Sequence, residues 1–366
     1  MMKNIKLTAI LLAGVLSVGA LSGCGKDNAA AGSADTASDY SQPVEITNVS
    51  YDPTRELYAA YNEAFAKHWK QKTGQDVTIT QSHGGSGKQA LEVANGLEAD
   101  VVTLALEGDV DAVRDAGLIE DGYIDEFDND SAPYTSSIVF LVRKDNPKQI
   151  QDWDDLLRDD VGVITPNPKT SGGARWNYLA AWYYFEKQGQ DEAQIQQSMK
   201  KLYENVLVLD SGARGATTSF VENKQGDVLL AWENEAFLSL EEYPDEYEIV
   251  VPSVSILCQP TVAVVDEVVD ERGTREVAEE YLNYLYSDEA QRLEADQFYR
   301  PTNADILAEY TSDSDSKTID AVPEDGKWII TKDFELTDID HFGGWTQATE
   351  KHFADGGIFD SIYEEK

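Results

Sequence analysis

Cysteine, methionine and histidine are scarce in this chain of 366 residues, which has two Cys, three Met and four His. The histidines are His68, His83, His341 and His352. They are scattered singly, so none has the spacing of a metal-binding motif such as H-E-x-x-H. The sequence therefore predicts neither a bound metal ion nor a cofactor.

Basic residues are also few. The chain has 29 Lys and Arg against 68 Asp and Glu, and its formal net charge is −39 at pH 7. Residues 1–23 carry two Lys and no acid, so their removal would leave a net charge of −41. Phosphate contacts need a basic surface, and we expect no nucleic-acid binding. Salt screens the charge beyond a Debye length of about 8 Å, so an anion site here must work by close contact.

Long apolar runs are missing except at the N-terminus. Lys3 and Lys6 precede an apolar run over 7–18, which ends in Leu-Ser-Gly-Cys at 21–24. This pattern predicts a secretory signal peptide over 1–23, too short for a transmembrane helix. The ending resembles a bacterial lipoprotein lipobox, which implies cleavage before Cys24 and lipid attachment to its sulfur. The alternative is an ordinary signal peptide with an incidental cysteine. Small and polar residues predict a flexible tether over 24–43.

The second cysteine, Cys258, has no partner if Cys24 carries a lipid. A disulfide within the mature chain is then impossible. Cys258 ends the apolar stretch Ser-Ile-Leu-Cys at 255–258. This context predicts a buried, inert thiol rather than a nucleophile.

Strands and helices alternate along the rest of the chain, which predicts mainly parallel α/β sheets. The apolar runs predict strands over 44–51, 77–80, 99–105, 137–143, 161–165, 206–209, 228–231 and 261–265. Helical spacing predicts helices over 53–73, 88–95, 109–115, 153–157, 175–186 and 276–293. Asp52 is the expected N-cap of the first helix, and Gly74 ends it. We expect 311–327, which is acidic and Ser-rich, to be a solvated loop, and 353–358 to dock on the body.

Small residues recur where an apolar run ends and a helical pattern begins, at 50–53, 83–87, 170–173 and 210–213. The first N–H groups of a helix lack internal partners and carry partial positive charge, so each turn suits an anion. Four such turns in one chain favour a single site for a small anion. None of them brings an obvious catalytic base, which favours binding over catalysis.

Ser86 and His83 raise the alternative of a secreted hydrolase. The turn around Ser86 lacks the second glycine of G-x-S-x-G, because Lys88 occupies its place. The same stretch does not match the phosphate-binding P-loop motif, since Ser82 stands in place of the first glycine and Gln89 in place of the final Ser or Thr. No orienting acid accompanies the Ser–His pair, so we expect the protein not to be an enzyme.

Five stretches of the chain resemble the sulfate-binding family of ABC-transporter receptors, a branch of the periplasmic-type binding proteins. These stretches are 48–56, 81–89, 164–178, 208–215 and 231–235. All five occur in order, and the resemblance extends over 46–305 and 343–360. It implies an α/β fold of two lobes, of the type II periplasmic-binding-protein kind. Crossing hinge strands would join the lobes, which close on a ligand in the cleft between them.

The resemblance also implies a sulfate site that consists of hydrogen-bond donors. The residues are Asp52 and Ala213 (backbone N–H), Ser86 and Ser171 (hydroxyl), Gly172 and Gly173 (helix N-terminus) and Trp232 (indole N–H, which can only donate). Outside this pattern Trp232 would be interpreted as a core residue, as Trp176 and Trp182 are. Arg175 and Arg214 follow two of the turns, and we expect them to brace these turns without touching the anion.

The implied function is that of an extracytoplasmic receptor that binds sulfate and delivers it to the permease of an ABC importer. It would be a monomer, anchored to the cell membrane through a lipid on Cys24, or periplasmic. Thiosulfate is the rival ligand, and the larger molybdate and tungstate are less favoured. A site made of donors would reject hydrogen phosphate, because the proton of that anion would lack an acceptor.

The resemblance gives approximate lobe borders. We expect the first lobe over 44–137 and the second over 138–261. The chain would return to the first lobe over 262–305, and 306–366 would form a C-terminal segment that packs on the lobes.

Overall fold

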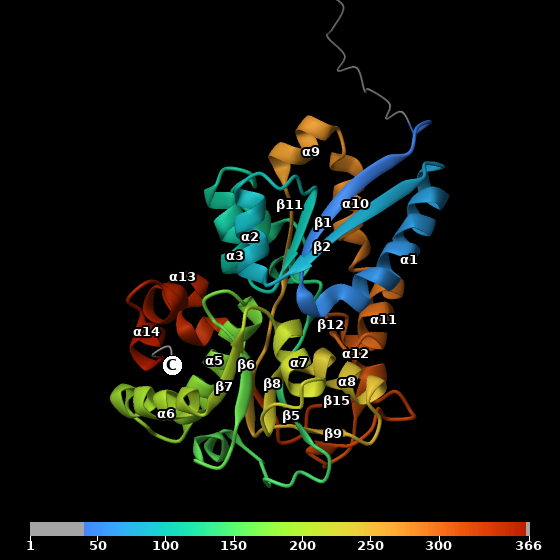
Figure 1. Cartoon of the computed structure of the whole chain (residues 1–366). Coiled ribbons are helices and arrows are strands. Elements are labelled where there is room, and N and C mark those ends of the chain that lie inside the picture. Colours follow the sequence, from blue (N-terminus) through green and yellow to red (C-terminus); the bar gives the residue numbers. More distant parts are fainter. Residues whose placement is uncertain (1–39, 364–366) are drawn as a thin grey trace, which may run out of the picture. The chain divides into compact units, whose positions relative to one another are not determined.

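The computed structural model describes residues 40–363, which form two lobes, each built on a mixed β-sheet (Figure 1). The predicted signal peptide, Cys24 and the tether up to residue 39 lie outside the described residues. Among the residues described, no helix has both the length and the apolar character needed to cross a bilayer.

The first lobe contains a four-stranded sheet in the order β11-β3-β1-β2. Its strands are β1 (Val44–Tyr51), β2 (Val77–Gly84), β3 (Val101–Leu104) and β11 (Thr261–Val264). Its helices are α1 (Arg55–Thr73), α2 (Ser86–Ala94), α3 (Glu107–Asp115), α9 (Asp266–Arg272) and α10 (Arg275–Tyr284). β1 is parallel to β2 and β3, whereas β11 is antiparallel to β3.

The predicted first strand and first helix are confirmed. The four-residue spacing of Leu57, Tyr61, Phe65 and Trp69 places all four side chains in the core. Gly74 ends the helix with φ of +82°, a left-handed conformation that glycine adopts without steric cost.

The predicted N-cap at Asp52 is wrong. Asp52 lies inside a short 3₁₀ helix (Asp52–Thr54), Tyr51 occupies the cap position, and no side chain caps the turn. The Asp52 carboxylate instead pairs with the Arg55 guanidinium at 3.0 Å. The Asp52 oxygen that could have capped the helix by accepting a backbone N–H is bonded to Arg55 instead.

The second lobe contains a six-stranded sheet in the order β14-β9-β5-β8-β6-β7. Its strands are β5 (Ile138–Arg143), β6 (Val163–Pro166), β7 (Val206–Asp210), β8 (Val228–Trp232), β9 (Tyr247–Val250) and β14 (Thr318–Ile319). Its helices are α5 (Gly172–Lys187), α6 (Glu192–Glu204), α7 (Ala213–Val221) and α8 (Glu233–Glu242). The short stretch 153–157 is a 3₁₀ helix, Trp153–Leu157.

Three structural expectations need correction. The sheets are mixed rather than mainly parallel, because β5 is antiparallel to both β8 and β9 and only β6 joins β7 and β8 in parallel. The helix over 276–293 is two helices, α10 and α11 (Asp288–Asp296), because Ser287 caps the second by accepting from Ala290 N–H. The stretch 311–327 is not all loop, since β14 within it pairs with β9.

The two lobes are joined by segments that cross between the sheets. Ser136 and Cys258 pair in an antiparallel bridge, with N–H···O distances of 3.0 and 2.9 Å, just before β5 and after β10 (Val254–Ile256). β12 (Arg300–Pro301) pairs with β4 (Tyr134–Thr135), which directly precedes Ser136. The predicted crossing hinge strands are therefore confirmed, whereas the residue borders of the lobes stay predictions. Cys258 is fully buried, and burial raises the pKa of its thiol, as expected of an inert group.

The C-terminal segment ends in α13 (Gly344–Ala348) and α14 (Ile358–Ile362) (Figure 1, red). α14 packs against α6 of the second lobe, whereas α13 contacts α3 of the first lobe and, through Trp345, α5 of the second. Before these two helices come α12 (Ala304–Tyr310) and the short strands β13 (Thr311–Ser312), β15 (Ile329–Ile330) and β16 (Glu335–Thr337). Phe353 is buried, and its ring centroid lies 5.1 Å from that of Tyr178. The predicted docking of 353–358 is thus confirmed at Phe353.

His352 makes this docking sensitive to acid. It is buried beside Trp182, and burial together with Lys351 lowers the pKa of its imidazole from 6.5 to about 4, with Glu192 opposing the shift. The unfolded chain therefore binds more protons between pH 6.5 and pH 4, so stability falls as the pH drops through this window.

We expect His352→Phe to make the unfolding free energy less sensitive to this pH drop than that of the wild type. The pKa shift of His352 corresponds to a loss of about 2–3 kcal/mol of unfolding free energy between pH 6.5 and pH 4, and His352→Phe should lack this loss. Urea titrations at several pH values measure it, with the exposed-site variant His341→Gln as the control. Equal pH slopes in the wild type and His352→Phe would show that His352 is not the acid-sensitive group.

Candidate anion-binding site

The structure brings the four small-residue turns together between the lobes. One small cavity is lined by Tyr51, Asp52, Pro53, Gly84, Gly85, Ser86, Ser171, Gly173 and Ala213. Five of the seven predicted ligand residues are among them. Trp232 lines an adjoining cavity that shares Gly173 and Ala213 with the first. Gly172 lines neither cavity but lies between Ser171 and Gly173 at the start of α5.

Helix N-termini surround this cavity. α2 begins at Ser86, α5 at Gly172 and α7 at Ala213, each directly after a strand and a turn. The first N–H groups of each helix have no partner within the helix and carry partial positive charge. Residues from the first turn of each helix line the cavity, so these ends can supply backbone donors to an anion there.

Ser86 and Ser171 each accept a hydrogen bond from a backbone N–H. Ser86 Oγ accepts from Ala105 N at 3.0 Å, and Ser171 Oγ accepts from Ala174 N at 3.4 Å. Both side chains are buried. Each hydroxyl can therefore still donate its own hydrogen. For Ser86 the buried Asp109 carboxylate is one acceptor within reach, because burial raises the pKa of Asp109 and a hydrogen bond with Ser86 opposes that rise.

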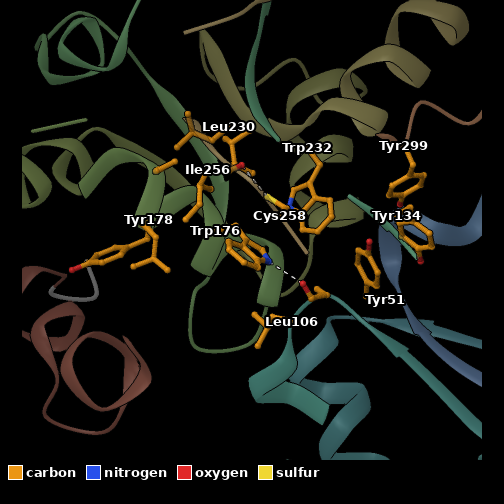
Figure 2. Close-up of a cluster of buried hydrophobic side chains, with 14 of the residues drawn as sticks. Tyr51, Leu106, Tyr134, Trp176, Tyr178, Leu230, Trp232, Ile256, Cys258 and Tyr299 are labelled. Atoms are coloured by element: carbon orange, nitrogen blue, oxygen red, sulfur yellow. Dashed lines mark hydrogen bonds between the residues drawn. The ribbon is translucent and has the colours of Figure 1, made fainter. Parts of the chain in front are cut away.

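Trp232 ends β8 and is buried, yet its indole Nε1 has no hydrogen-bond partner. A methyl group added at Gly173 would lie 3.1 Å from this nitrogen and 3.6 Å from Ser171 Oγ, so both donors border the same glycine. The ring of Tyr51 packs 5.4 Å from the Trp232 ring between centroids (Figure 2). An unpaired buried donor is costly, so this N–H is available to a ligand that enters beside Gly173.

Glycines let the lobes approach closely at the site. A Cβ at Gly85 would lie 2.8 Å from the carbonyl oxygens of both Thr170 and Ser211, which belong to the second lobe. A Cβ at Gly212 would collide with the Asp52 carboxylate of the first lobe. The sequence showed that these turns are rich in glycine, but not that the glycines face each other.

Arginine side chains lie near the cavity without lining it. Arg175 Nε donates to Pro168 O at 3.1 Å, just before the Ser171 turn, and its Nη1 lies 3.7 Å from the buried Asp109 carboxylate. Burial raises the pKa of Asp109, while Arg175 opposes the rise. The expected bracing of a turn is thus seen for Arg175.

Arg214 does not brace its own turn. It donates to the Glu56 carboxylate at 2.8 Å, across the lobes, and lies 3.7 Å from the buried Glu235. Burial raises the pKa of Glu235, and Arg214 opposes this rise. Sequence reasoning missed these partners, because residues far apart in sequence make each pair.

His83 and Ser86 do not form a catalytic pair. His83 Nε2 is buried without a hydrogen-bond partner, and Ser86 Oγ is bonded to Ala105 N–H instead. Burial lowers the pKa of His83 to about 4, and the positive charges of Arg55 and Arg214 add to the effect. Among residues 40–363, no group of three or more His, Cys, Asp or Glu side chains is arranged to hold a metal ion.

Comparisons with known proteins identify the family. Residues 54–300 match the model of a family described as bacterial extracellular solute-binding protein. The sulfate-binding protein of Escherichia coli K12 is 56% identical over 87% of this chain and 93% of its own length. The chain belongs to the sulfate-binding family of bacterial extracellular solute-binding proteins. Its two-lobed α/β fold is that of the type II periplasmic binding proteins.

Other members of the family are similar over comparable lengths. A thiosulfate-binding protein of Pseudomonas aeruginosa is 46% identical over 87% of this chain and 92% of its own. The solved structure of the sulfate-binding protein of Mycobacterium tuberculosis H37Rv superimposes with a TM-score of 0.72 at 28% identity. The superposition covers 88% of this chain and 100% of the Mycobacterium tuberculosis chain. Both relatives from the sequence comparison are named as binding proteins.

Proposed function

We propose that this protein is an extracytoplasmic receptor that binds sulfate between its lobes and delivers it to the permease of an ABC importer. The observation that carries the proposal is the buried, unpaired indole N–H of Trp232 beside Gly173. Trp232 lines a cavity that shares Gly173 and Ala213 with the neighbouring cavity of Ser86 and Ser171. The ligand contacts would be Asp52, Ser86, Ser171, Gly172, Gly173, Ala213 and Trp232.

The chemistry of the cavity favours a fully ionised oxyanion. Sulfate loses strong hydration when it leaves water, and several aligned donors must replace it. The lining residues include no Lys or Arg, so helix termini, hydroxyls and one indole would disperse the charge. Ser86 and Ser171 each accept one backbone N–H, which restricts the orientation of the hydroxyl, and we propose that both hydroxyls donate to the anion. Such a site suits a tetrahedral dianion without a proton.

The relatives support this ligand and keep one alternative open. Relatives named for sulfate and for thiosulfate are 56% and 46% identical to this chain. Thiosulfate has the charge and nearly the shape of sulfate, so it is the second candidate; molybdate and tungstate are larger and less favoured. A lipid on Cys24 would hold the receptor at the membrane surface, and we propose that it works there as a monomer.

Phosphate discrimination tests the proposal. Hydrogen phosphate keeps a proton that needs an acceptor, and an unpaired buried donor costs about 1–3 kcal/mol. We expect phosphate to bind at least about 10- to 100-fold more weakly than sulfate at neutral pH. Calorimetric titration of the purified, anion-free protein with sulfate, thiosulfate, molybdate and phosphate measures the affinities.

Each outcome of this titration has a distinct meaning. Tight sulfate binding without detectable phosphate binding supports the receptor role and a site made of hydrogen-bond donors. A preference for thiosulfate keeps the mechanism and changes the physiological ligand. Comparable sulfate and phosphate affinities would contradict the donor site. Silence for all four anions in folded protein, or ester hydrolysis that depends on Ser86, would overturn the proposed function.

A further inference from the structure

A hydrogen bond links the lobes beside the anion cavity. Trp176 lies in α5 of the second lobe, and its side chain is fully buried. Its indole Nε1 donates to the carbonyl oxygen of Ala105 at 2.9 Å, and Ala105 directly follows β3 of the first lobe. Figure 2 shows the nitrogen of Trp176 pointing toward the chain next to Leu106. This bond therefore exists only while the two lobes are in contact.

The same residue, Ala105, also holds Ser86. Its N–H donates to Ser86 Oγ at 3.0 Å, and both Ala105 and Ser86 are buried. The backbone of Ala105 is thus fixed on one side by the Trp176 indole and on the other by the Ser86 hydroxyl. With that N–H bonded to its oxygen, Ser86 has its hydroxyl hydrogen left to donate, and a bound anion would compete for it with the Asp109 carboxylate.

The C-terminal segment holds the Trp176 ring. Trp345 of α13 is buried and meets Trp176 edge to face, with centroids 4.6 Å apart and planes at 87°. A methyl group added at Gly108 of α3 would lie 3.4 Å from Trp345 Cβ, so Trp345 also touches the first lobe. It therefore packs where Trp176 meets the first lobe.

A lysine ties the segment to the second lobe. Lys169 Nζ donates to Phe353 O at 2.9 Å and to Ala354 O at 3.2 Å, and it pairs with Asp360 at 2.7 Å. Lys169 lies in the loop that leads into the Ser171 turn. The C-terminal segment is thus attached to the second lobe beside the anion cavity. Trp345 also contacts the first lobe, at Gly108.

We propose that Trp176, held by Trp345, is a positioning residue that acts through Ala105 to keep the Ser86 hydroxyl oriented as a donor to the bound anion. The proposal rests on the sulfate-binding function proposed above. It gives the C-terminal segment a part in the binding site, although none of its residues lines the anion cavity. The competing interpretation is that both tryptophans only fill the core.

A double-mutant cycle with Ser86 separates these interpretations. Trp176→Phe removes the indole donor and keeps an aromatic ring, so we expect sulfate affinity to fall about 3- to 10-fold. Trp345→Leu removes the aromatic edge that holds Trp176, and we expect a smaller loss of about 2- to 5-fold. In a Ser86→Ala background both losses should shrink to less than about 2-fold, because the group that they position is gone.

A matched control and a second readout make the test specific. Trp182→Phe changes the same helix, where the ring packs on His352 rather than near Ala105, and it should leave sulfate affinity unchanged. Trp176→Phe should also lower the ratio of sulfate to phosphate affinity, since a Ser86 hydroxyl that is free to rotate can turn a lone pair toward the phosphate proton. Core packing alone would not move this ratio.

The outcomes distinguish this inference from the function on which it rests. The inference is supported if the losses of sulfate affinity in Trp176→Phe and Trp345→Leu disappear in the Ser86→Ala background while Trp182→Phe binds sulfate as the wild type does. Equal losses in both backgrounds with an unchanged anion ratio would show that the tryptophans only pack, and the inference falls while the receptor role stands. A wild-type protein that binds none of the anions would overturn the function, and the inference with it.

Discussion

Gly85→Ala is expected to weaken sulfate binding by about 10- to 100-fold. The added Cβ would lie 2.8 Å from the carbonyl oxygens of Thr170 and Ser211, and these are backbone atoms that no rotamer change can move away. Overpacking of this kind costs about 1–3 kcal/mol. The cost applies when the lobes close, because Thr170 and Ser211 lie on the lobe opposite Gly85. Calorimetric titration with sulfate measures the loss.

Stability and a neighbouring variant serve as controls for this prediction. Gly85 has φ of −61° and ψ of 130°, which any residue adopts, so unfolding without sulfate should change by less than about 0.5 kcal/mol. Gly87→Ala adds a methyl group in the same turn, with its nearest neighbour at 3.5 Å, and should bind sulfate normally. Wild-type affinity in Gly85→Ala would mean that the bound lobes do not approach this closely.

Trp232→Phe is expected to weaken sulfate binding by about 10- to 100-fold. The substitution keeps a ring against Tyr51 and removes the only polar group of the side chain. A hydrogen bond to a charged group contributes about 1.5–3 kcal/mol, which sets the size of the loss. The same titration measures it, and thermal unfolding without ligand checks that the fold is kept.

Trp328→Phe is the matched control for this variant. Trp328 is also buried with an unpaired Nε1, but it packs against Phe237 and Phe298 in a separate core cluster. Its variant should bind sulfate as the wild type does. If both variants lose the same affinity, the effect comes from general loosening of the cores rather than from a donor at the anion.

Local patterns in the sequence predicted the parts of the fold that neighbouring residues determine. The spacing of Leu57, Tyr61 and Phe65 predicted α1, and Gly74 predicted its end, because both depend on residues within a few turns. The break at Ser287 was missed, since the apolar spacing continues across it and only the cap bond to Ala290 N–H shows it. Antiparallel pairing of β5 was missed because it depends on partners about 90 residues away.

The same division applies to the candidate site. Serine and glycine at helix starts, such as Ser171 and Gly173, can be recognised from the sequence because they mark a local turn. Trp176 was correctly expected in the core, but its bond to Ala105, 71 residues earlier, was not foreseen. No local pattern can show a contact that forms only when two lobes meet.

The indole N–H of Trp232 offers the most direct test of the central claim that this donor contacts sulfate. A ¹H–¹⁵N spectrum of the protein should contain indole signals from its seven Trp, and the one missing in Trp232→Phe belongs to Trp232. On titration with sulfate, we expect this signal to move downfield as a new charge-assisted hydrogen bond forms, while the Trp328 signal stays in place. A Trp232 signal that does not move at saturating sulfate would contradict the account.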